Sequence, residues 1–264
     1  MFIIPVNELK NKLDALRKEL SQQPLFCFTS DVDWASEYAI EQSLQYFEKF
    51  GIPVTFFLTH KSDVLDDVIQ KELVHAGIHP NFLQESSQGN SFDEVIDFCF
   101  NLLPNAICFR SHRYFEVNDV YEKMYSRGIR YVSNTCTFLE NIPPFLHRSG
   151  LVQFPIFFED GAYLWQGGEL SFKSVKHIFS SNGLKVINIH PMHLMLNTPY
   201  FAYTRKIKDA VSKEEWNCFD EQAIKKMRSS EIGIADFINE MIEFIEIKNI
   251  KVINLNDMYE KLIQ

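Results

Sequence analysis

The chain has 264 residues, a formal net charge of −9 at pH 7 and a hydrophobic fraction of 46%, with 24 phenylalanines. This length suits one large α/β domain, and the apolar content is ample for a large, aromatic-rich core. No basic run stands out, which argues against a partner that is nucleic acid or an anionic membrane surface.

Strands and helices alternate along most of the chain. Apolar residues at helical spacing over 6–22 predict an N-terminal helix within residues 1–23 that ends before Pro24. Short apolar runs predict strands at 25–30, 54–59, 77–79, 106–110, 129–133, 151–157, 184–190 and 250–255. Helical patterns lie between most of them, at 36–50, 63–75, 92–103, 117–127, 171–181 and 234–248.

This alternation predicts an α/β fold with a parallel sheet. Seven or eight such units in one chain favour a closed or nearly closed barrel over an open sheet. The rhythm breaks at residues 194–233, where no strand is predicted and aromatic residues are scattered among charges. We expect this segment to be either a lid over the barrel mouth or a peripheral insertion. Without a repeat or linker, residues 1–264 are predicted to form a single domain.

The five cysteines are odd in number and widely spaced, with no C-x-x-C pair. Most lie in apolar runs, which is typical of reduced core thiols in a cytosolic protein. The first residues show neither a signal peptide nor a membrane span. We therefore expect a soluble, cytoplasmic protein, and the sequence leaves its oligomeric state open.

Polar residues follow four of the predicted strands. In a parallel barrel the carboxyl ends of all strands open on one face, so these residues are expected to meet at one mouth. This clustering is the strongest functional signal in the sequence. The four segments are Asp31-Val-Asp33, His79-Pro-Asn81, Arg110-Ser-His112 and His190-Pro-Met-His193.

Asp31 and Asp33 are two residues apart, so both side chains leave a strand on the same side. Two carboxylates at this spacing repel each other unless a cation lies beside them. A divalent metal would bind one carboxylate and leave the other free to take a proton from water. In the alternative interpretation, Asp31 caps the helix that begins near Ser36.

His79 stands at a strand tip before Pro80, and imidazole is a usual zinc ligand beside carboxylate. A structural histidine is the alternative. His75 lies four residues earlier, but Gly77 breaks any helix between the two. We expect His75 to be a helix-end or surface residue.

Five segments, in this order, resemble the motifs of the polysaccharide deacetylase superfamily, whose members include carbohydrate esterase family four. Phe28-Thr-Ser-Asp31-Val-Asp33-Trp34 is similar to its Thr-Phe-Asp-Asp motif. The order and spacing extend over residues 25–193. The other four segments are Pro53-Val-Thr-Phe-Phe-Leu58, Ala76-Gly-Ile-His79, Phe109-Arg110 and Ile187-Asn-Ile-His190.

The resemblance implies a deformed (β/α) barrel, of about seven parallel strands here, that removes acetyl groups from N- or O-acetylated sugars. It implies that Asp33 and His79 bind the metal, with zinc as the expected ion. It further implies that Asp31 is the general base, that His190 is the general acid and that Arg110 orients Asp31. The residue types suit this chemistry, because a metal lowers the pKa of water and imidazole protonates a leaving group.

The sequence departs from the family pattern at the metal site. The family has a second histidine four residues after the first, and that position is Leu83 here. His112 is our first candidate for the missing ligand. Its alternative role is hydrogen bonding or substrate contact. Weaker candidates for the ligand are Asn81, Gln88 and His193.

Further residues are candidates for substrate contact. Trp34 and Trp165 lie in predicted mouth loops and could stack on a sugar ring, although core packing is the alternative. Glu159 or Asp160 is expected either to support the arginine, as an aspartate does in the family, or to make a turn before Gly161. The predicted substrate-binding residues are Trp34, Asn81, Asp160 and His193.

We expect the substrate to be a sugar nucleotide or lipid-linked glycan precursor of surface-polysaccharide biosynthesis. Two alternatives remain open at this point. A relative that lacks one metal ligand could bind carbohydrate without catalysis. A metal hydrolase on this fold could instead cleave another bond, such as a phosphoester or a cyclic amide.

Overall fold

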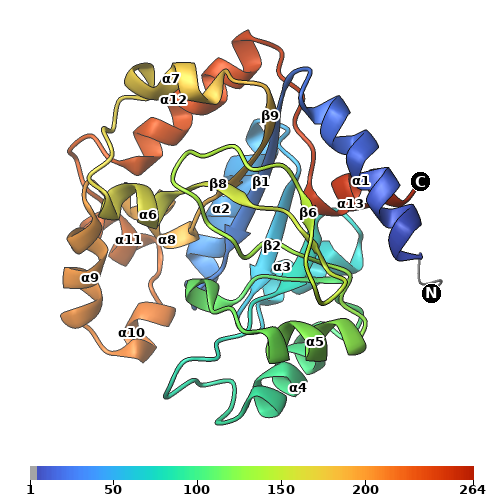
Figure 1. Ribbon diagram of the computed structural model, residues 1–264. Helices are drawn as coiled ribbons and strands as arrows, with labels where there is room; N and C mark the ends of the chain where they lie inside the picture. Colours follow the sequence, from blue (N-terminus) through green and yellow to red (C-terminus); the bar gives the residue numbers. More distant parts are fainter. Residues whose placement is uncertain (1–4) are drawn as a thin grey trace.

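The computed structural model describes residues 5–264 and shows a curled sheet surrounded by helices (Figure 1). Residues 1–4, the start of the predicted N-terminal segment, lie outside this described part. The strand order is β6-β7-β5-β4-β3-β2-β1-β9-β8, and all pairs except β6 with β7 are parallel. The strands are β1 (Pro24–Asp31), β2 (Val54–Leu58), β3 (His75–Ile78), β4 (Cys108–Phe109), β5 (Tyr131–Val132), β6 (Phe145–Leu146), β7 (Val152–Gln153), β8 (Ile156–Glu159) and β9 (Gly183–Asn188).

Helices cover the outer face of the sheet, and the predicted alternation of strands and helices is confirmed. Within residues 5–264, no helix is both long and apolar enough to span a membrane. The helices that follow or precede strands are α1 (Val6–Leu20), α2 (Glu37–Lys49), α3 (Asp63–Gln70), α4 (Phe92–Leu102), α5 (Asn118–Ser126), α6 (Asp160–Trp165), α7 (Phe172–Phe179), α8 (Pro191–Leu196), α12 (Ile234–Ile247) and α13 (Leu255–Ile263).

The edge strand β8 approaches the segment that follows β5, so that the sheet is nearly closed into a barrel. Cys136, just after β5, forms an isolated parallel bridge with Ile156 of β8. The Ile156 N–H donates to the Thr135 carbonyl at 2.8 Å, and the Thr137 N–H donates to the Ile156 carbonyl at 2.9 Å. The predicted nearly closed barrel is therefore confirmed.

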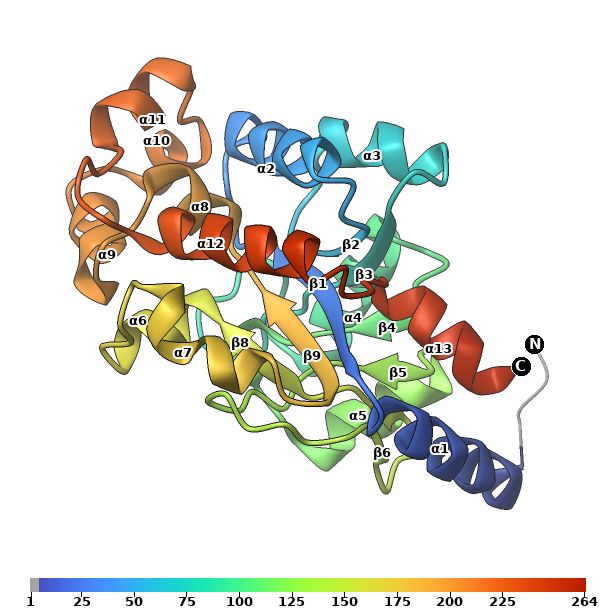
Figure 2. The same ribbon diagram turned by 90° about the horizontal axis from the view of Figure 1, so that it is seen from above.

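Side chains alternate between the interior and the exterior of the barrel, as they must along a strand. In β1, Leu25 and Cys27 belong to the interior cluster, whereas Phe26 and Phe28 pack outside against the helices. The same interior cluster contains apolar residues of α1 and α13. These two helices lie side by side at the end of the barrel where β1 begins (Figure 2). The interior is thus closed at that end, and its other end carries the polar residues.

Two predicted strands differ from the structure. The run at 151–157 is two strands, β7 and β8, which pair with β5 and β9 respectively. Pro155 separates them because proline has no N–H for a sheet ladder. The run at 250–255 is not a strand of the sheet: it makes one isolated bridge, between Val252 and Phe26. Strand β2 pairs with β1 only from Phe28 onward, so the part of β1 before Phe28 has a free edge on that side. Val252 pairs with Phe26 at this free edge.

Helix α3 is also shorter than predicted, because β3 begins at His75. His75 is therefore a strand residue and not a helix end. It is a surface residue, as expected, and its Nε2 lies 3.7 Å from the Asp257 carboxylate.

The segment predicted as a lid or insertion, residues 194–233, contains the end of α8 and three further helices. These are α9 (Phe201–Asp209), α10 (Lys213–Asn217) and α11 (Glu221–Met227). Figure 2 shows them grouped beyond the arrowhead of β9, next to α6 and α8. This group therefore stands near the carboxyl ends of the strands, where the polar residues gather.

Candidate active site

The polar residues at the mouth continue the inward-facing side of the strands. Thr29 and Asp31 share the parity of Leu25 and Cys27 in β1. Arg110 follows Cys108 in the same way. The interior therefore changes from an apolar layer to a polar layer toward the carboxyl ends, as the four polar strand ends predict.

Arg110 is completely buried and lies beside Asp31. Its Nη1 donates to Asp31 Oδ1 at 2.8 Å, while its Nε and Nη2 donate to the carbonyl and hydroxyl of Ser133 at 2.7 and 2.8 Å. The guanidinium carbon lies 4.4 Å from the centroid of the Phe57 ring, an arrangement that favours a cation. Ser133 and Phe57 thus fix the guanidinium, and it in turn orients one oxygen of Asp31.

Asn188, at the end of β9, fixes the other oxygen of Asp31. Its Nδ2 donates to Asp31 Oδ2 at 2.8 Å, and its Oδ1 accepts from Arg110 Nη1 at 2.6 Å. Thr29 completes the ring, because its hydroxyl accepts from Arg110 at 2.8 Å and lies 3.1 Å from Asn188 Oδ1. Both oxygens of Asp31 are therefore held in place.

Asp33 lies beside two imidazoles. Its Oδ1 is 3.1 Å from His79 Nε2 and 3.0 Å from His112 Nδ1. One ligand atom from each of these three residues lies within 4.8 Å of the others. Burial opposes ionisation of Asp33, but the charges and hydrogen bonds of His112 and His79 outweigh it and hold the pKa of this carboxyl well below its ordinary value. One carboxylate with two imidazoles is a donor set that suits zinc and similar divalent metals.

His190 faces the two aspartates from the end of β9. Its Nε2 lies 4.0 Å from Asp31 Oδ2 and 3.5 Å from Asp33 Oδ2. Its Nδ1 lies 2.6 Å from Asp160 Oδ1, and its backbone N–H donates to Asp160 Oδ2 at 2.7 Å. Burial lowers the pKa of His190, but the charge and hydrogen bond of Asp160, with Asp33, raise it well above its ordinary value.

A second buried carboxyl, Glu159, lies close to the same ring. Its Oε1 is 3.4 Å from His190 Nδ1, and its side chain accepts from the N–H groups of Gly161 and Ala162 at the start of α6. Burial raises the pKa of Glu159 to about 7, with Asp160 acting in the same direction and His190 opposing both. Asp160 therefore carries the negative charge beside His190, and Glu159 serves as the helix cap.

His193 is placed behind His190. Its Nδ1 lies 3.1 Å from the Thr198 hydroxyl and 3.3 Å from the Thr204 hydroxyl of α9. Burial lowers the pKa of His193 to about 4. Asp160, His190 and His193 also bring one ligand atom each within 4.8 Å of one another. Both oxygens of Asp160 are already bonded to His190, however, so the Asp33 group is the one whose carboxylate is better placed to hold a metal.

The backbone around Asp33 and His112 adopts left-handed conformations that are uncommon for residues other than glycine. Asp33 and Trp34 have φ values of 47° and 55°, and Arg113 and Tyr114 have values of 53° and 56°. The first pair includes Asp33, and the second adjoins His112. Such conformations cluster at functional sites, where the surrounding structure holds them.

Comparison with known proteins places this arrangement in a family. The family model described as WbmS-like polysaccharide deacetylase matches residues 28–208. The chain belongs to this family. It is therefore a carbohydrate deacetylase-like hydrolase of the class that acts on C–N or ester bonds. The resemblance drawn from the five sequence segments is confirmed.

A solved structure shares the fold. A proposed polysaccharide deacetylase involved in O-antigen biosynthesis from Bordetella bronchiseptica superposes with a TM-score of 0.75 at 21% identity, over 90% of this chain and 98% of that chain. A proposed polysaccharide deacetylase from Mycobacterium smegmatis has a TM-score of 0.46 at 14% identity, over 89% and 94% of the chains. No curated protein matches the chain. The first of these structures confirms the expected deformed (β/α) barrel.

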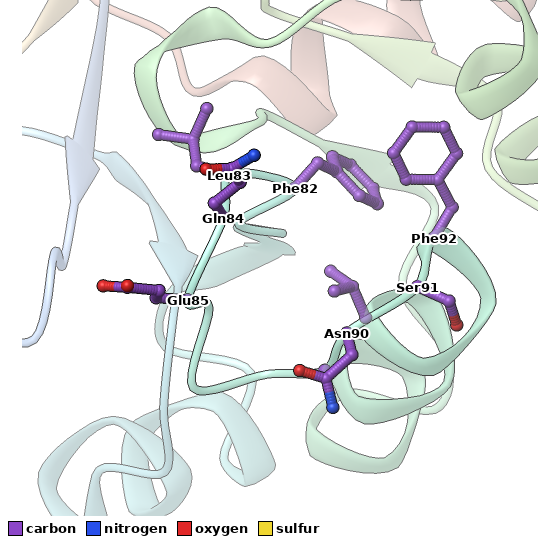
Figure 3. Close-up of a pocket in the computed structure, with 9 residues that line it drawn as sticks. Phe82, Leu83, Gln84, Glu85, Asn90, Ser91 and Phe92 are labelled. Atoms are coloured by element: carbon purple, nitrogen blue, oxygen red, sulfur yellow. The ribbon is translucent and has the colours of Figure 1, made fainter.

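The loop after β3 shows how this member of the family departs from the pattern. Leu83, at the position of the family's second histidine, lines a pocket of about 470 Å³ between this loop and α4 (Figure 3). Asn81 uses its side-chain oxygen within the loop, accepting from the Leu83 N–H at 3.1 Å. Gln88 is buried and donates to the carbonyls of Thr59 and His79 at 2.9 and 3.1 Å. Through Gln88, the loop thus holds the backbone of His79 in place. The donor atom that joins those of Asp33 and His79 comes from His112 and not from this loop.

The remaining sequence candidates have distinct places. The Trp34 ring meets the His112 ring edge-on with centroids 5.2 Å apart. Trp165 is exposed at the end of α6 and packs against Phe201 of α9, with centroids 4.9 Å apart. Asp160 is fully buried beneath His190, and neither Asp160 nor Glu159 contacts the arginine, so the expectation that one of them supports Arg110 is wrong. Ser133 occupies that place instead.

The sequence interpretation missed three residues of the Asp31 network: Thr29, Ser133 and Asn188. A signal for two of them was present. Thr29 and Asn188 stand two residues before Asp31 and His190 in their strands, so the period of two places them on the same inward face. Ser133 stands two residues after the inward-facing Tyr131, but it does not precede a predicted site residue. Reading the strands backward from the site residues in steps of two would have found Thr29 and Asn188 only.

Proposed function

We propose that this protein is a divalent-metal-dependent deacetylase that removes an acetyl group from an N- or O-acetylated sugar, with zinc as the metal. The observation that carries this proposal is the position of Asp31. Its two oxygens are held by Arg110 and Asn188, and they lie 4.0 Å from His79 Nδ1 and 4.0 Å from His190 Nε2. A base and an acid therefore face the same small space beside the metal donors.

The proposed roles follow from this placement. Asp33, His79 and His112 would hold the metal, which when bound polarises the acetyl carbonyl and lowers the pKa of water. Asp31 takes the proton of the attacking water, because its oxygens are fixed and face the site. His190 Nε2 gives a proton to the leaving amine or alkoxide, and Asp160 supports the protonated imidazole from the opposite side of the ring.

The substrate we propose is a soluble or lipid-linked precursor of a surface polysaccharide. The match to a protein described as involved in O-antigen biosynthesis supports this choice. A cytoplasmic location is supported by the five free thiols, of which Cys27, Cys99 and Cys108 are buried. Trp34 and Trp165 are the proposed contacts for the sugar ring, together with Asn81 and His193.

The test is acetate release from acetylated sugar nucleotides and glycans, measured on zinc-loaded protein and on chelator-treated protein. Zinc-dependent release that is lost in Asp33→Ala is the expected result. Metal analysis of the wild type and of Asp33→Ala gives a second readout that does not depend on the substrate. Release that survives both chelation and Asp33→Ala would contradict the metal mechanism.

The same experiment separates the other two functions. If the protein binds stoichiometric zinc and turns over a phosphoester or a cyclic amide but releases no acetate, the result would favour a metal hydrolase that cleaves one of those bonds. Sugar binding without zinc and without turnover would favour a carbohydrate-binding relative. The matched control is His75→Ala, which removes a surface imidazole outside the site and is expected to leave zinc content and turnover unchanged.

A further inference from the structure

The pocket between the loop after β3 and α4 is a cavity that the proposed reaction does not use. Its volume of about 470 Å³ lies within the range of small-molecule pockets, about 300–1,000 Å³. Phe82 and Val95, which are buried, and the half-buried Phe92 and Leu83 supply the apolar part of its lining. The rings of Phe82 and Phe92 meet edge to face with centroids 5.4 Å apart, and Glu85 lies on the other side of the pocket (Figure 3).

The polar part of this lining is unused within the protein. The side chains of Gln84, Glu85 and Asn90 line the pocket and are exposed. Across the described residues 5–264, none of these three side chains makes a hydrogen bond or an ion pair, and Asn90 donates through its backbone N–H to Glu94 Oε2 at 2.7 Å. Two amides and one carboxylate are therefore available to hydroxyl groups, which both donate and accept hydrogen bonds.

The loop that forms the pocket is fixed against α4. Gly89 has φ 154°, and a Cβ added there would lie 2.6 Å from Glu94 Cβ and 2.9 Å from the Val95 nitrogen. The loop therefore approaches the helix more closely than a residue with a side chain allows. Gln88, the residue before it, is buried and donates to the His79 carbonyl at 3.1 Å. The pocket thus keeps a set position relative to His79.

The pocket adjoins both imidazoles of the candidate metal group. Phe82 stands three residues after His79, so their Cα atoms are at most about 11 Å apart. Phe115 stands three residues after His112, and its ring lies 5.7 Å from the ring of Phe82 and 5.8 Å from that of Phe92, measured between centroids. A glycan whose acetylated sugar lies at these imidazoles can therefore place a neighbouring ring in the pocket.

The charges around the pocket oppose an anionic ligand. Glu85 lines it, and Asp93 and Glu94 stand in the first turn of α4. These two acidic residues also offset the positive end of the helix dipole. Among the described residues that line the pocket, none is a lysine, an arginine or a histidine. A phosphate or a uronic acid is therefore disfavoured here, and a neutral sugar is not.

We propose that this pocket binds a neutral sugar ring next to the acetylated one, so that the enzyme selects an oligosaccharide over a single sugar. This inference rests on the proposed deacetylase function. The apolar C–H face of the sugar packs against Phe92 and Phe82, while its hydroxyl groups bond to Gln84 and Asn90. An apolar lining with a few placed polar groups is the usual composition of a small-molecule site. A hydrocarbon chain would use only the apolar part of this lining.

The experiment compares kcat/KM for acetate release from the methyl glycoside of N-acetylglucosamine with that from its disaccharide and trisaccharide. We expect the wild type to favour an oligosaccharide. Gln84→Ala and Asn90→Ala are each expected to lower the ratio of oligosaccharide to monosaccharide kcat/KM by about twofold to tenfold, the effect of one lost hydrogen bond. The matched control is Asn101→Ala, an exposed amide of α4 outside the pocket, whose ratio is expected to stay within about twofold of the wild type.

The apolar contact is tested by Phe92→Ala against Phe98→Ala. Phe98 is an exposed phenylalanine of the same helix that does not line the pocket. We expect the ratio to fall by about tenfold or more in Phe92→Ala and to stay within about twofold of the wild type in Phe98→Ala. Phe92 also packs against two other rings, so the amide variants, which alter exposed side chains, carry the test if Phe92→Ala does not fold.

The preference for a neutral ring is tested with a disaccharide in which glucuronic acid replaces the sugar next to N-acetylglucosamine. We expect the wild type to use this substrate less well than the neutral disaccharide. Glu85→Gln is expected to raise its kcat/KM relative to the neutral disaccharide by about twofold to fivefold, because one exposed repulsive charge is removed. An unchanged relative kcat/KM would contradict the role of Glu85.

The proposal is overturned if the wild type shows no preference for an oligosaccharide, or if Asn101→Ala lowers the ratio as much as Asn90→Ala. Calorimetric titration of the zinc-loaded protein with the trisaccharide covers the case in which no substrate releases acetate. Binding that is weakened in Gln84→Ala and Asn90→Ala, but not in Asn101→Ala, would then support the sugar pocket while the deacetylase function fails. Absent binding, or equal binding in all four proteins, overturns the pocket as well.

Discussion

Asp160 binds His190 at two points, through the backbone N–H at 2.7 Å and through ring Nδ1 at 2.6 Å. The carboxylate therefore fixes both the position of the residue and the rotation of its ring. It also leaves Nε2 directed toward Asp31 and Asp33. A proton carried by this ring is stabilised on one side and available on the other, which is what a general acid needs.

Asp160→Asn is expected to move the alkaline limb of the kcat profile to lower pH by at least about one unit, because an opposite charge at this distance raises the pKa of an imidazole by that amount or more. His190 would then lose its proton at a lower pH. The measurement is kcat against pH with zinc at saturation. Glu159→Gln is the control: burial raises the pKa of Glu159 to about 7, so less charge is removed at neutral pH and a smaller shift is expected. Equal shifts in the two variants would contradict the assignment to Asp160.

Asn188→Ala tests whether Asn188 holds Asp31, the proposed general base, in its orientation. The variant removes the donor to Asp31 Oδ2 and one acceptor of Arg110. We expect kcat to fall by about tenfold to a hundredfold, with KM changed much less, because Asp31 would no longer be held in one orientation. The free energy of unfolding is expected to fall by about 1–3 kcal/mol, since a buried polar group loses its partner. If the free energy of unfolding falls but kcat is unchanged, Asn188 has only a structural role.

The sequence predicted most of the parallel strands, most boundaries of the helices that it proposed and the four polar strand ends, because each depends on local periodicity and on one rule about parallel sheets. It did not predict α6, α8, α9, α10, α11 or α13. Pro155 is a sequence signal for the break between β7 and β8, but the continuous apolar run from 151 to 157 led to the prediction of a single strand. The bridge at Val252 could not be predicted, since it depends on how far β2 extends along β1.

The same distinction applies to the site. Asp31, Asp33, His79, Arg110 and His190 stand at strand ends in chain order, so their meeting follows from topology. The partner of Arg110 does not follow from topology, because Ser133 and Asp160 both lie near strand ends. Only the three-dimensional packing determines that Ser133 contacts the guanidinium and that Asp160 contacts His190.

His112→Ala tests the choice of the third metal donor. We expect the affinity for zinc to fall by more than about tenfold, because the variant would leave only Asp33 and His79 as protein donors. Competition with a chromogenic chelator measures the Kd without any substrate. His193→Ala is the matched control, since it removes a neighbouring imidazole from the Asp160 group and is expected to leave the zinc Kd within about threefold of the wild type. A larger effect in His193→Ala than in His112→Ala would assign the metal to the other group.

Gly233→Ala tests the junction between the 194–233 segment and α12. An added Cβ at residue 233 would lie 2.1 Å from the Asn197 carbonyl oxygen and 2.5 Å from its Oδ1. Asn197 itself adopts a left-handed conformation, φ 46°, and its Oδ1 accepts from the Ala235 N–H at 3.0 Å. The backbone therefore has little freedom to move away. We expect a loss of about 1–3 kcal/mol in the free energy of unfolding, measured by urea denaturation.

A second substitution shows whether the backbone or the side chain of Asn197 causes this loss of stability. If the side chain of Asn197 caused the clash, Asn197→Ala would restore stability in the Gly233→Ala background. The closest atom is the backbone oxygen, however, and alanine keeps it. We therefore expect the double variant to be no more stable than Gly233→Ala, and less stable by the loss of the Asn197 hydrogen bonds to Glu231 and Asp236. Recovery in the double variant would show that the side chain, and not the close approach of the two backbones, requires glycine at this position.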